Sequence, residues 1–150
     1  MAVKRNCFPR AVMEGISQIL GDTQKGLSGN EIQNLLAQVQ IIDVEPTITK
    51  RKRLFSAFAN YQNNSQCSNA ILNFIKEALA PSRFVNNHIN FEEKRALINQ
   101  QLHFVGYQYN ENGTFSEITQ AKTISDAQLK ADNLKSKLEM RGTHFEIFKY

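Results

Sequence analysis

Cysteine, histidine and long hydrophobic runs are all scarce in this chain of 150 residues. The two cysteines, Cys7 and Cys67, are too few for a disulfide framework and lack the close Cys or His spacing of a zinc site. No stretch reaches the roughly 18 apolar residues that a membrane helix needs, and the N-terminal "MAVKRNCFPR" lacks the apolar segment of a secretion signal. We therefore expect a cytoplasmic protein with reduced thiols and no membrane partner.

Catalytic signatures are missing as well. The sequence contains no Ser/His/Asp order, no glycine loop that cradles phosphate and no paired carboxylates above chance. His103 is expected to be partly exposed on a helix, and His144 lies in a predicted helix cap. We therefore predict no catalytic residue, no metal ligand and no cofactor.

One short pattern leaves an enzymatic alternative open. Arg83 and His88 have the Arg-x4-His spacing of the ribonuclease motif in HEPN proteins, where these side chains act on the RNA phosphate and the ribose hydroxyl. In that family the motif lies on a helix, whereas Pro81 and the pair Asn86-Asn87 predict a loop here. Ribonuclease activity is thus a third hypothesis, and His88→Ala is expected to leave any activity unchanged.

The composition is that of a folded domain with a weak preference for acidic partners. Hydrophobic residues make up 41% of the chain and charged residues 21%, which is enough for one substantial core. The 18 basic and 14 acidic side chains give a net charge of +4. This charge favours anionic ligands over long range but is far below that of a protein that coats DNA.

Apolar periodicity predicts helices through the first half of the chain. Residues 9–20 carry apolar side chains at helical spacing, and Ser28 with Glu31 forms a capping box for a second helix. Pro46 interrupts the chain before a third helix, expected from about 49 to 61. A polar run, "NYQNNSQCSN", is then expected to separate it from a fourth helix, "AILNFIKEALA".

The second half is expected to add a helix and a hairpin. Asn90 and Glu93 have cap spacing for a fifth helix, on which Leu97 is placed on the inward face, and Gly106 suits its left-handed exit. The alternation after Gly106 and the turn at Asn112-Gly113 predict a small hairpin. The fold class is therefore mainly α, with about six helices and one antiparallel β-hairpin, and a helix-turn-helix or winged-helix arrangement is a further expectation.

The C-terminal part predicts a link to a further domain. We expect a helical domain over residues 1–122, a long helix over 123–142 capped at Ser125, and the start of another helix at 143–150. The last segment carries four large apolar side chains. Such a face favours association, so we expect a downstream domain or another subunit to cover it, including a homo-oligomer.

The segment "ITKRKRLF" carries the main functional hypothesis. On a helical projection Leu54, Phe55 and Phe58 form the core face, and Arg51 lies over the edge of that face. The open side then displays donors suited to phosphate and base edges. A solvated first turn is the alternative. The predicted nucleic-acid-binding residues are Lys50, Lys52, Arg53, Ser56 and Asn60.

A family resemblance extends over almost the whole chain. The succession "GISQILGDT", "GLSGNEIQNLL", "ITKRKRLFSAF" and "FEEKRALINQQLHFVGYQYNENGTFSEI" resembles the N-terminal region of the prophage-associated Ymh family of bacterial proteins. The resemblance implies that a HEPN-like helical domain follows, similar to those of abortive-infection proteins. We expect a non-catalytic module that binds or senses DNA or RNA in phage defence. The alternative is a protein-interaction or oligomerisation scaffold for a C-terminal HEPN-like effector.

Overall fold

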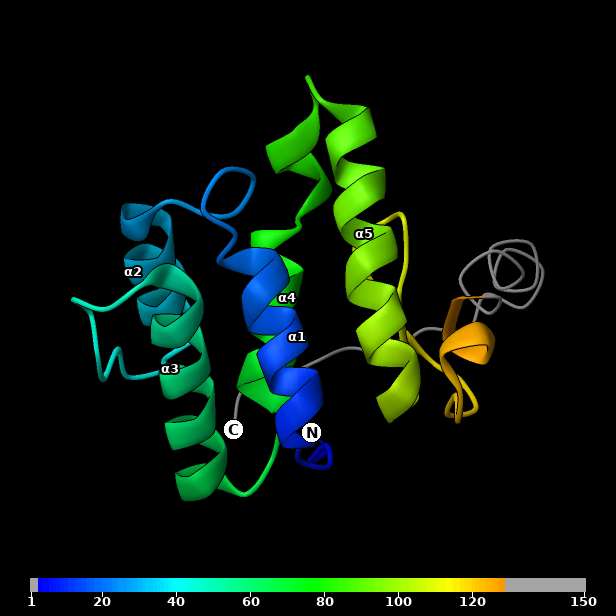
Figure 1. Cartoon of the computed structure of the whole chain (residues 1–150), viewed down its shortest axis with the longest axis horizontal. Helices are drawn as coiled ribbons and strands as arrows, with labels where there is room; N and C mark the ends of the chain where they lie inside the picture. The colour runs from blue at the N-terminus through cyan, green and yellow to red at the C-terminus, as the bar shows by residue number, and fades with distance from the viewer. Residues whose placement is uncertain (1–2, 129–150) are drawn as a thin grey trace. The chain divides into compact units, whose positions relative to one another are not determined.

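The computed structural model describes residues 3–128 of the chain (Figure 1). The described residues form five α-helices, two short 3-10 helices and one two-stranded sheet, and residues 124–128 begin a further helix. This confirms the predicted fold class. The elements are α1 (Arg10–Leu20), α2 (Gly29–Gln38), α3 (Lys50–Ser65), α4 (Asn69–Ala78), η1 (Pro81–Phe84), α5 (His88–Leu102), η2 (His103–Val105), β1 (Tyr107–Tyr109) and β2 (Phe115–Glu117).

The contacts divide the described chain into two compact units, which we call unit 1 (residues 3–78) and unit 2 (residues 79–128). Unit 1 contains α1 to α4, and unit 2 contains the remaining elements. The predicted domain over residues 1–122 spans both units. The two predicted C-terminal segments lie outside the described residues, apart from the onset of the first.

In unit 1, α1 and α3 run side by side in opposite directions, and α2 packs on α3 and α4 (Figure 1). The rings of Phe58 and Phe74 meet edge to face with centroids 5.2 Å apart, an arrangement favoured by the aromatic quadrupole. Each helix buries one apolar stripe, as its periodicity predicts. The fully buried large side chains of this unit are Ile16, Leu20, Ile32, Leu36, Leu54, Phe58, Ile71, Leu72, Phe74 and Ile75.

The capping box predicted at the start of α2 is confirmed. Ser28 Oγ accepts from the Glu31 amide at 3.1 Å, and Glu31 Oε1 accepts from the Ser28 amide at 2.8 Å. The predicted end of the third helix is wrong, because α3 continues to Ser65 and ends at Gln66 in the left-handed region. Its last turns stay helical because they are partly buried. Gln62 there exchanges hydrogen bonds with the backbone of Phe8, at 2.7 and 3.1 Å.

In unit 2 the hairpin packs along α5. The antiparallel strands pair Tyr107 with Glu117 and Tyr109 with Phe115. Asn99 of α5 exchanges two hydrogen bonds with the backbone of Tyr109, at 2.7 and 3.0 Å, and so fixes β1 to the helix. Gly106 has φ +87°, which confirms the predicted left-handed exit.

The N-terminus of α5 differs from the prediction. Asn87 is the N-cap, and its side chain accepts from the Asn90 amide at 3.2 Å, so the helix begins at His88 and not near Asn90. The 3-10 turn before it places Phe84 against Phe91, with ring centroids 5.5 Å apart. Leu97 is 47% exposed, so its predicted inward placement is also wrong.

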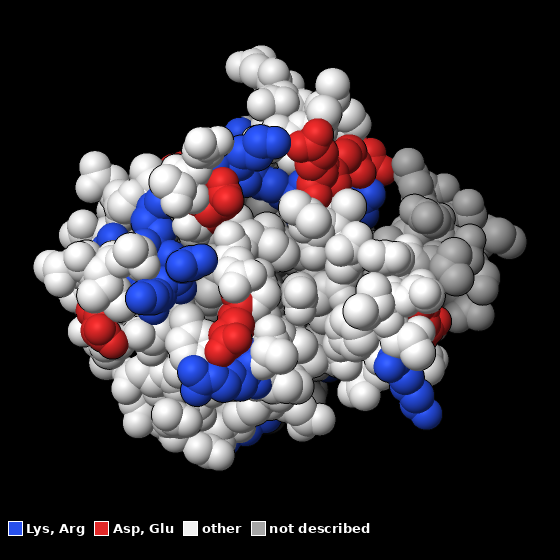
Figure 2. Space-filling model, viewed as in Figure 1, with Lys and Arg blue, Asp and Glu red and all other residues white. Residues whose placement is uncertain are grey.

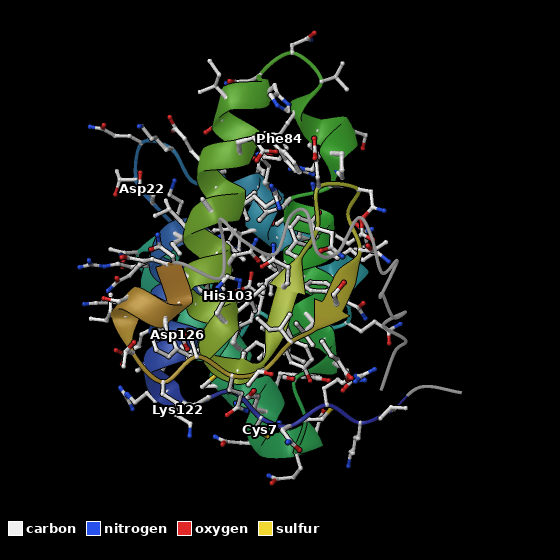
Figure 3. All side chains as sticks on the ribbon, turned by 90° about the vertical axis from the view of Figure 1, so that its right-hand side faces the viewer. Cys7, Asp22, Phe84, His103, Lys122 and Asp126 are labelled. Atoms are coloured by element: carbon white, nitrogen blue, oxygen red, sulfur yellow. The ribbon has the colours of Figure 1, made fainter. Side chains whose placement is uncertain are left out.

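His103 is completely buried, which corrects the expectation of partial exposure. Figure 3 shows it at the end of α5 beside the hairpin. One ring nitrogen lies 2.6 Å from the Ala127 carbonyl, and the other contacts Gln108 Oε1. The last described helix is capped by Thr123, whose hydroxyl accepts from the Asp126 amide at 3.0 Å, and not by Ser125.

Among residues 3–128, none of the helices is both long enough and apolar enough to cross a membrane.

Candidate nucleic-acid interface

The first turn of α3 brings four cations together at the N-terminus of a helix. Lys50, Arg51, Lys52 and Arg53 begin α3, and its first turn contains no acidic residue. Thr49 precedes them as the N-cap and makes no side-chain hydrogen bond to the helix. The exposed amides and the macrodipole make this end of a helix positive, so the four cations add to an existing attraction for anions.

Arg53 lies in the protein interior and not on the open side of α3, so its predicted placement is wrong. Only 7% of the residue is exposed. Its guanidinium donates to both carboxylate oxygens of Asp43, with Nε–Oδ1 at 3.1 Å, and to the Gly29 carbonyl at 3.3 Å. The hydrogen bond to Asp43 raises the pKa of Arg53 above its usual value. Arg53 therefore ties the segment before α3 and the start of α2 to α3.

The helical projection failed because its core face was centred on the wrong residue. Phe55 is only half-buried, whereas Leu54, Ala57 and Phe58 are fully buried. The true core face is therefore rotated toward Arg53. Arg51, which was expected to cover the edge of the core, is exposed.

A groove in unit 1 is lined by residues of α1, of the segment before α3 and of the side of α3 that carries Arg51 and Lys52. Its volume is about 530 Å³. Two of the predicted binding residues, Lys52 and Ser56, line it, whereas Lys50, Arg53 and Asn60 do not. Figure 2 shows basic side chains gathered over the N-terminal part of α3, with acidic ones between them. The charged residues that line the groove are Arg10, Glu14, Glu45, Arg51 and Lys52.

Four polar side chains of the groove are already engaged with one another. Arg10 Nε donates to Glu14 at 2.8 Å, and its guanidinium lies 4.9 Å from the ring centre of Phe55. Ser56 Oγ donates to Glu45 at 3.0 Å, so its hydroxyl proton is used within the protein.

Arg51 and Lys52 remain available to a ligand. Both are exposed, and neither makes a hydrogen bond or an ion pair with any of residues 3–128. Lys50 makes a long contact from Nζ to the Thr23 carbonyl at 3.4 Å. Arg51 and Lys52 are thus the two cations of the groove that can bind an anion. Lys52 was predicted to bind nucleic acid, whereas Arg51 was predicted to pack over the edge of the core.

Sequence reasoning missed Arg10 as well as Arg51. Arg10 opens α1 and reaches the groove because α1 lies beside α3, and no local pattern announces that pairing. The centre of the buried stripe was a readable signal for Arg51. Ala57 lies one helical turn after Arg53 on the buried face of α3. A helical projection that counted Ala57 as a core residue would have placed Arg51 on the surface.

The residues of the ribonuclease hypothesis occupy separate elements of unit 2. Arg83 lies in η1, and His88 is the first residue of α5; both are exposed. The predicted loop is therefore confirmed only for residues 85–87, whereas Arg83 and His88 themselves lie in helical elements. Catalysis by this pair stays a hypothesis.

Comparisons with protein-family models, with curated proteins and with solved structures give no match for this chain. The resemblance to the Ymh family therefore stays a prediction.

Proposed function

We propose that this chain is a non-catalytic module that binds the phosphate backbone of DNA or RNA along the groove between α1 and α3. In the wider setting implied by the family resemblance, it senses nucleic acid in a phage-defence protein and precedes a HEPN-like domain. A net charge of +4 favours the approach of such a ligand.

The observation that carries this proposal is the state of Arg51 and Lys52. Both are exposed on the groove at the positive end of α3, and neither has a partner within residues 3–128. Cations in the first turn of a helix oppose the macrodipole and slightly destabilise the helix. A phosphate placed there relieves that repulsion and accepts hydrogen bonds from both side chains.

The groove favours backbone contacts over base recognition. Its aromatic residue, Phe55, is half-buried and lies under the Arg10 guanidinium. A base therefore has little aromatic surface on which to stack, and the cations supply most of the interaction. Contacts to phosphate position a protein without reading sequence, so we expect weak sequence preference and strong salt dependence.

The test is a binding titration of the full chain with duplex DNA, single-stranded DNA and RNA at two salt concentrations. We expect the double variant Arg51→Glu/Lys52→Glu to lose binding. The matched control Lys76→Glu/Lys122→Glu changes the net charge equally at two residues that do not line the groove, and it should keep most of the binding. Milder changes to Ala should flatten the dependence of log affinity on log salt by about 0.9 for each duplex phosphate that the variant no longer neutralises.

Two results would overturn the proposal. One is a parent chain that binds none of the three nucleic acids at low salt. The other is an equal loss of affinity in both double variants, since this would mean that net charge alone and not the groove holds the ligand.

A second candidate function is a protein-interaction scaffold, supported by apolar exposure in unit 2. Val85 and Ile89 are 78% and 73% exposed; Val85 lies in the turn after η1, and Ile89 is the second residue of α5. Two large apolar side chains exposed within one short segment favour association. Sedimentation of the parent and of Val85→Ser/Ile89→Ser tests this role. A concentration-dependent oligomer that the double variant weakens supports it, and two identical monomers exclude self-association through these residues.

A further inference from the structure

Three side chains with metal-binding groups converge in unit 2. A ring nitrogen of His88 and carboxylate oxygens of Glu92 and Glu111 all lie within 4.8 Å of one another. His88 and Glu111 are exposed, and Glu92 is half-buried. These residues play no part in the groove of unit 1.

The backbone holds the three residues near one another. His88 and Glu92 are one helical turn apart on the same face of α5. Glu111 lies in the loop that joins β1 to β2. The Asn99 side chain fixes β1 to α5 through two hydrogen bonds with Tyr109, so the loop is anchored beside the helix.

Glu92 is prepared for a further ligand. Its Oε2 accepts from Arg95 Nη2 at 2.9 Å, and Arg95 Nη1 donates to the Tyr109 carbonyl at 3.2 Å. The other oxygen, Oε1, is shielded from solvent and has no hydrogen-bond partner among the described residues. A shielded carboxylate oxygen without a donor is unfavourable, and a cation within reach would satisfy it.

We propose that His88, Glu92 and Glu111 bind a divalent transition-metal ion of the zinc type. One imidazole and two carboxylates provide three ligands, and water completes a tetrahedral shell. The imidazole favours zinc and its neighbours in the first transition row over calcium or magnesium, which prefer oxygen alone. Arg95 then acts from outside the shell by orienting the Glu92 carboxylate, as outer partners do in known metal sites.

Distance and charge are compatible with this assignment. Ligands at about 2.0–2.2 Å from a tetrahedral ion are separated by about 3.4 Å. Rotation of the exposed His88 and Glu111 side chains closes the remaining gap. His88 is the first residue of α5, so the macrodipole opposes a cation there, as does the Arg95 guanidinium 2.9 Å from Glu92. The two negative charges of Glu92 and Glu111 together exceed the charge of Arg95 and the partial charge of the helix end.

The ion would fasten the start of α5 to the hairpin loop. A two-stranded hairpin is marginal by itself and depends on packing against other elements. Binding to the folded form would therefore stabilise unit 2 in proportion to the logarithm of the free zinc concentration once the site is nearly saturated. This role is structural and independent of the nucleic-acid groove.

The test is a zinc titration by calorimetry of the full chain without an affinity tag, after removal of metal with a chelator. A Cys7→Ser background removes the exposed thiol, which could also bind zinc. We expect one ion per chain, a higher unfolding temperature with zinc, and a shift of the His88 ring signals in NMR spectra. Glu111→Gln should weaken binding at least tenfold. The control Glu93→Gln removes the same charge from an exposed position on α5 outside the cluster and should bind zinc as the parent does.

His88→Ala provides a second variant with the same expected loss. The proposal is overturned if zinc does not bind at millimolar concentration, or if calcium or magnesium binds more tightly than zinc. It is also overturned if Glu111→Gln and His88→Ala both retain the affinity of the parent, because the ion would then be held elsewhere.

Discussion

The first turn of α3 in unit 1 contains four cations, whereas the first turn of α5 in unit 2 contains neither an acidic residue nor a lysine or arginine and is followed by Glu92. The former begins with four cations and no acid, of which Arg51 and Lys52 are free among the described residues. The latter lies beside the cluster of His88, Glu92 and Glu111. The comparison teaches that the two helix ends suit opposite ligands, an anion in unit 1 and a metal cation in unit 2.

The largest expected effect is on DNA affinity, and it should leave zinc binding in unit 2 unchanged. Arg51→Glu/Lys52→Glu should lower the affinity for duplex DNA by roughly 100-fold or more at low salt, because two phosphate contacts become repulsive. The same variant should bind zinc as the parent does. In reverse, Glu111→Gln should lose zinc affinity and keep DNA affinity. Parallel titrations of both ligands check this, and a loss of both ligands in either variant would break the comparison.

The next largest effect is on stability, and it distinguishes the buried Arg53 from the exposed Arg51 in unit 1. Arg53→Ala should lower the free energy of unfolding by about 2 kcal/mol, since Asp43 and the Gly29 carbonyl lose their donor in a largely buried setting. Arg51→Ala, on the exposed side, should leave stability nearly unchanged. Urea unfolding of the two variants measures the difference. Equal stability would mean that the Arg53–Asp43 pair contributes nothing net.

Alkaline pH should act on unit 1 through Tyr61. Burial, together with the hydrogen bond to Cys67, raises the pKa of this phenol to about 12. Below pH 10 the phenol is neutral in the folded and unfolded states. Between about 10 and 12 the unfolded chain loses the proton first, so stability should fall by roughly 1 to 2 kcal/mol by pH 11. Unfolding curves at pH 9 and pH 11 measure this loss.

Tyr61→Phe provides the control for that pH dependence. The variant removes the titrating group and should show a smaller loss between the same two pH values. It also removes the acceptor of the Ala70 amide, at 3.1 Å, so its stability at pH 9 should be lower than that of the parent. An unchanged pH dependence would assign the loss to other groups.

The smallest effect compares the helix caps of the two units. Ser28 takes part in a complete capping box on α2, whereas the Asn87 side chain accepts a single amide on α5. Ser28→Ala should cost about 1 kcal/mol, because the Glu31 amide loses its acceptor and the Glu31 side chain loses the reciprocal bond that holds it in place. Asn87→Ala should cost about half as much, because only a single hydrogen bond, without a reciprocal one, is removed. Thermal unfolding of both variants checks the order, and a larger loss for Asn87→Ala would reverse it.

Much of the fold was predictable because its signals are local. Ser28 and Glu31 cap α2 as expected, and Gly106 takes the left-handed exit. The hairpin turn at Asn112-Gly113 also follows from residues a few positions apart. The errors occurred where a distant partner decided the outcome. Gln62, for example, extends α3 beyond its predicted end while bonding the backbone of Phe8.

The candidate site was predictable only in part. The sequence indicated cations in the first turn of α3, and Lys52 and Ser56 do line the groove. It did not indicate which cations are free, because Asp43 engages Arg53 across a connecting segment. The cluster of unit 2 was missed for the same reason, since the hairpin returns Glu111 to His88 and Glu92 from far along the chain.

The sequence by itself determined the presence of the helices, the capping box of α2, the hairpin turn and the concentration of positive charge at the start of α3. These features depend on backbone preferences and hydrogen bonds between residues a few positions apart. Only the tertiary structure decided that Arg53 is buried and hydrogen-bonded to Asp43 and Gly29, and that Arg51 has no partner among the described residues. It also decided that three metal-binding side chains meet in unit 2. The physical reason is that burial and ion pairing depend on which helix faces pack together, and many distant apolar contacts set that packing jointly.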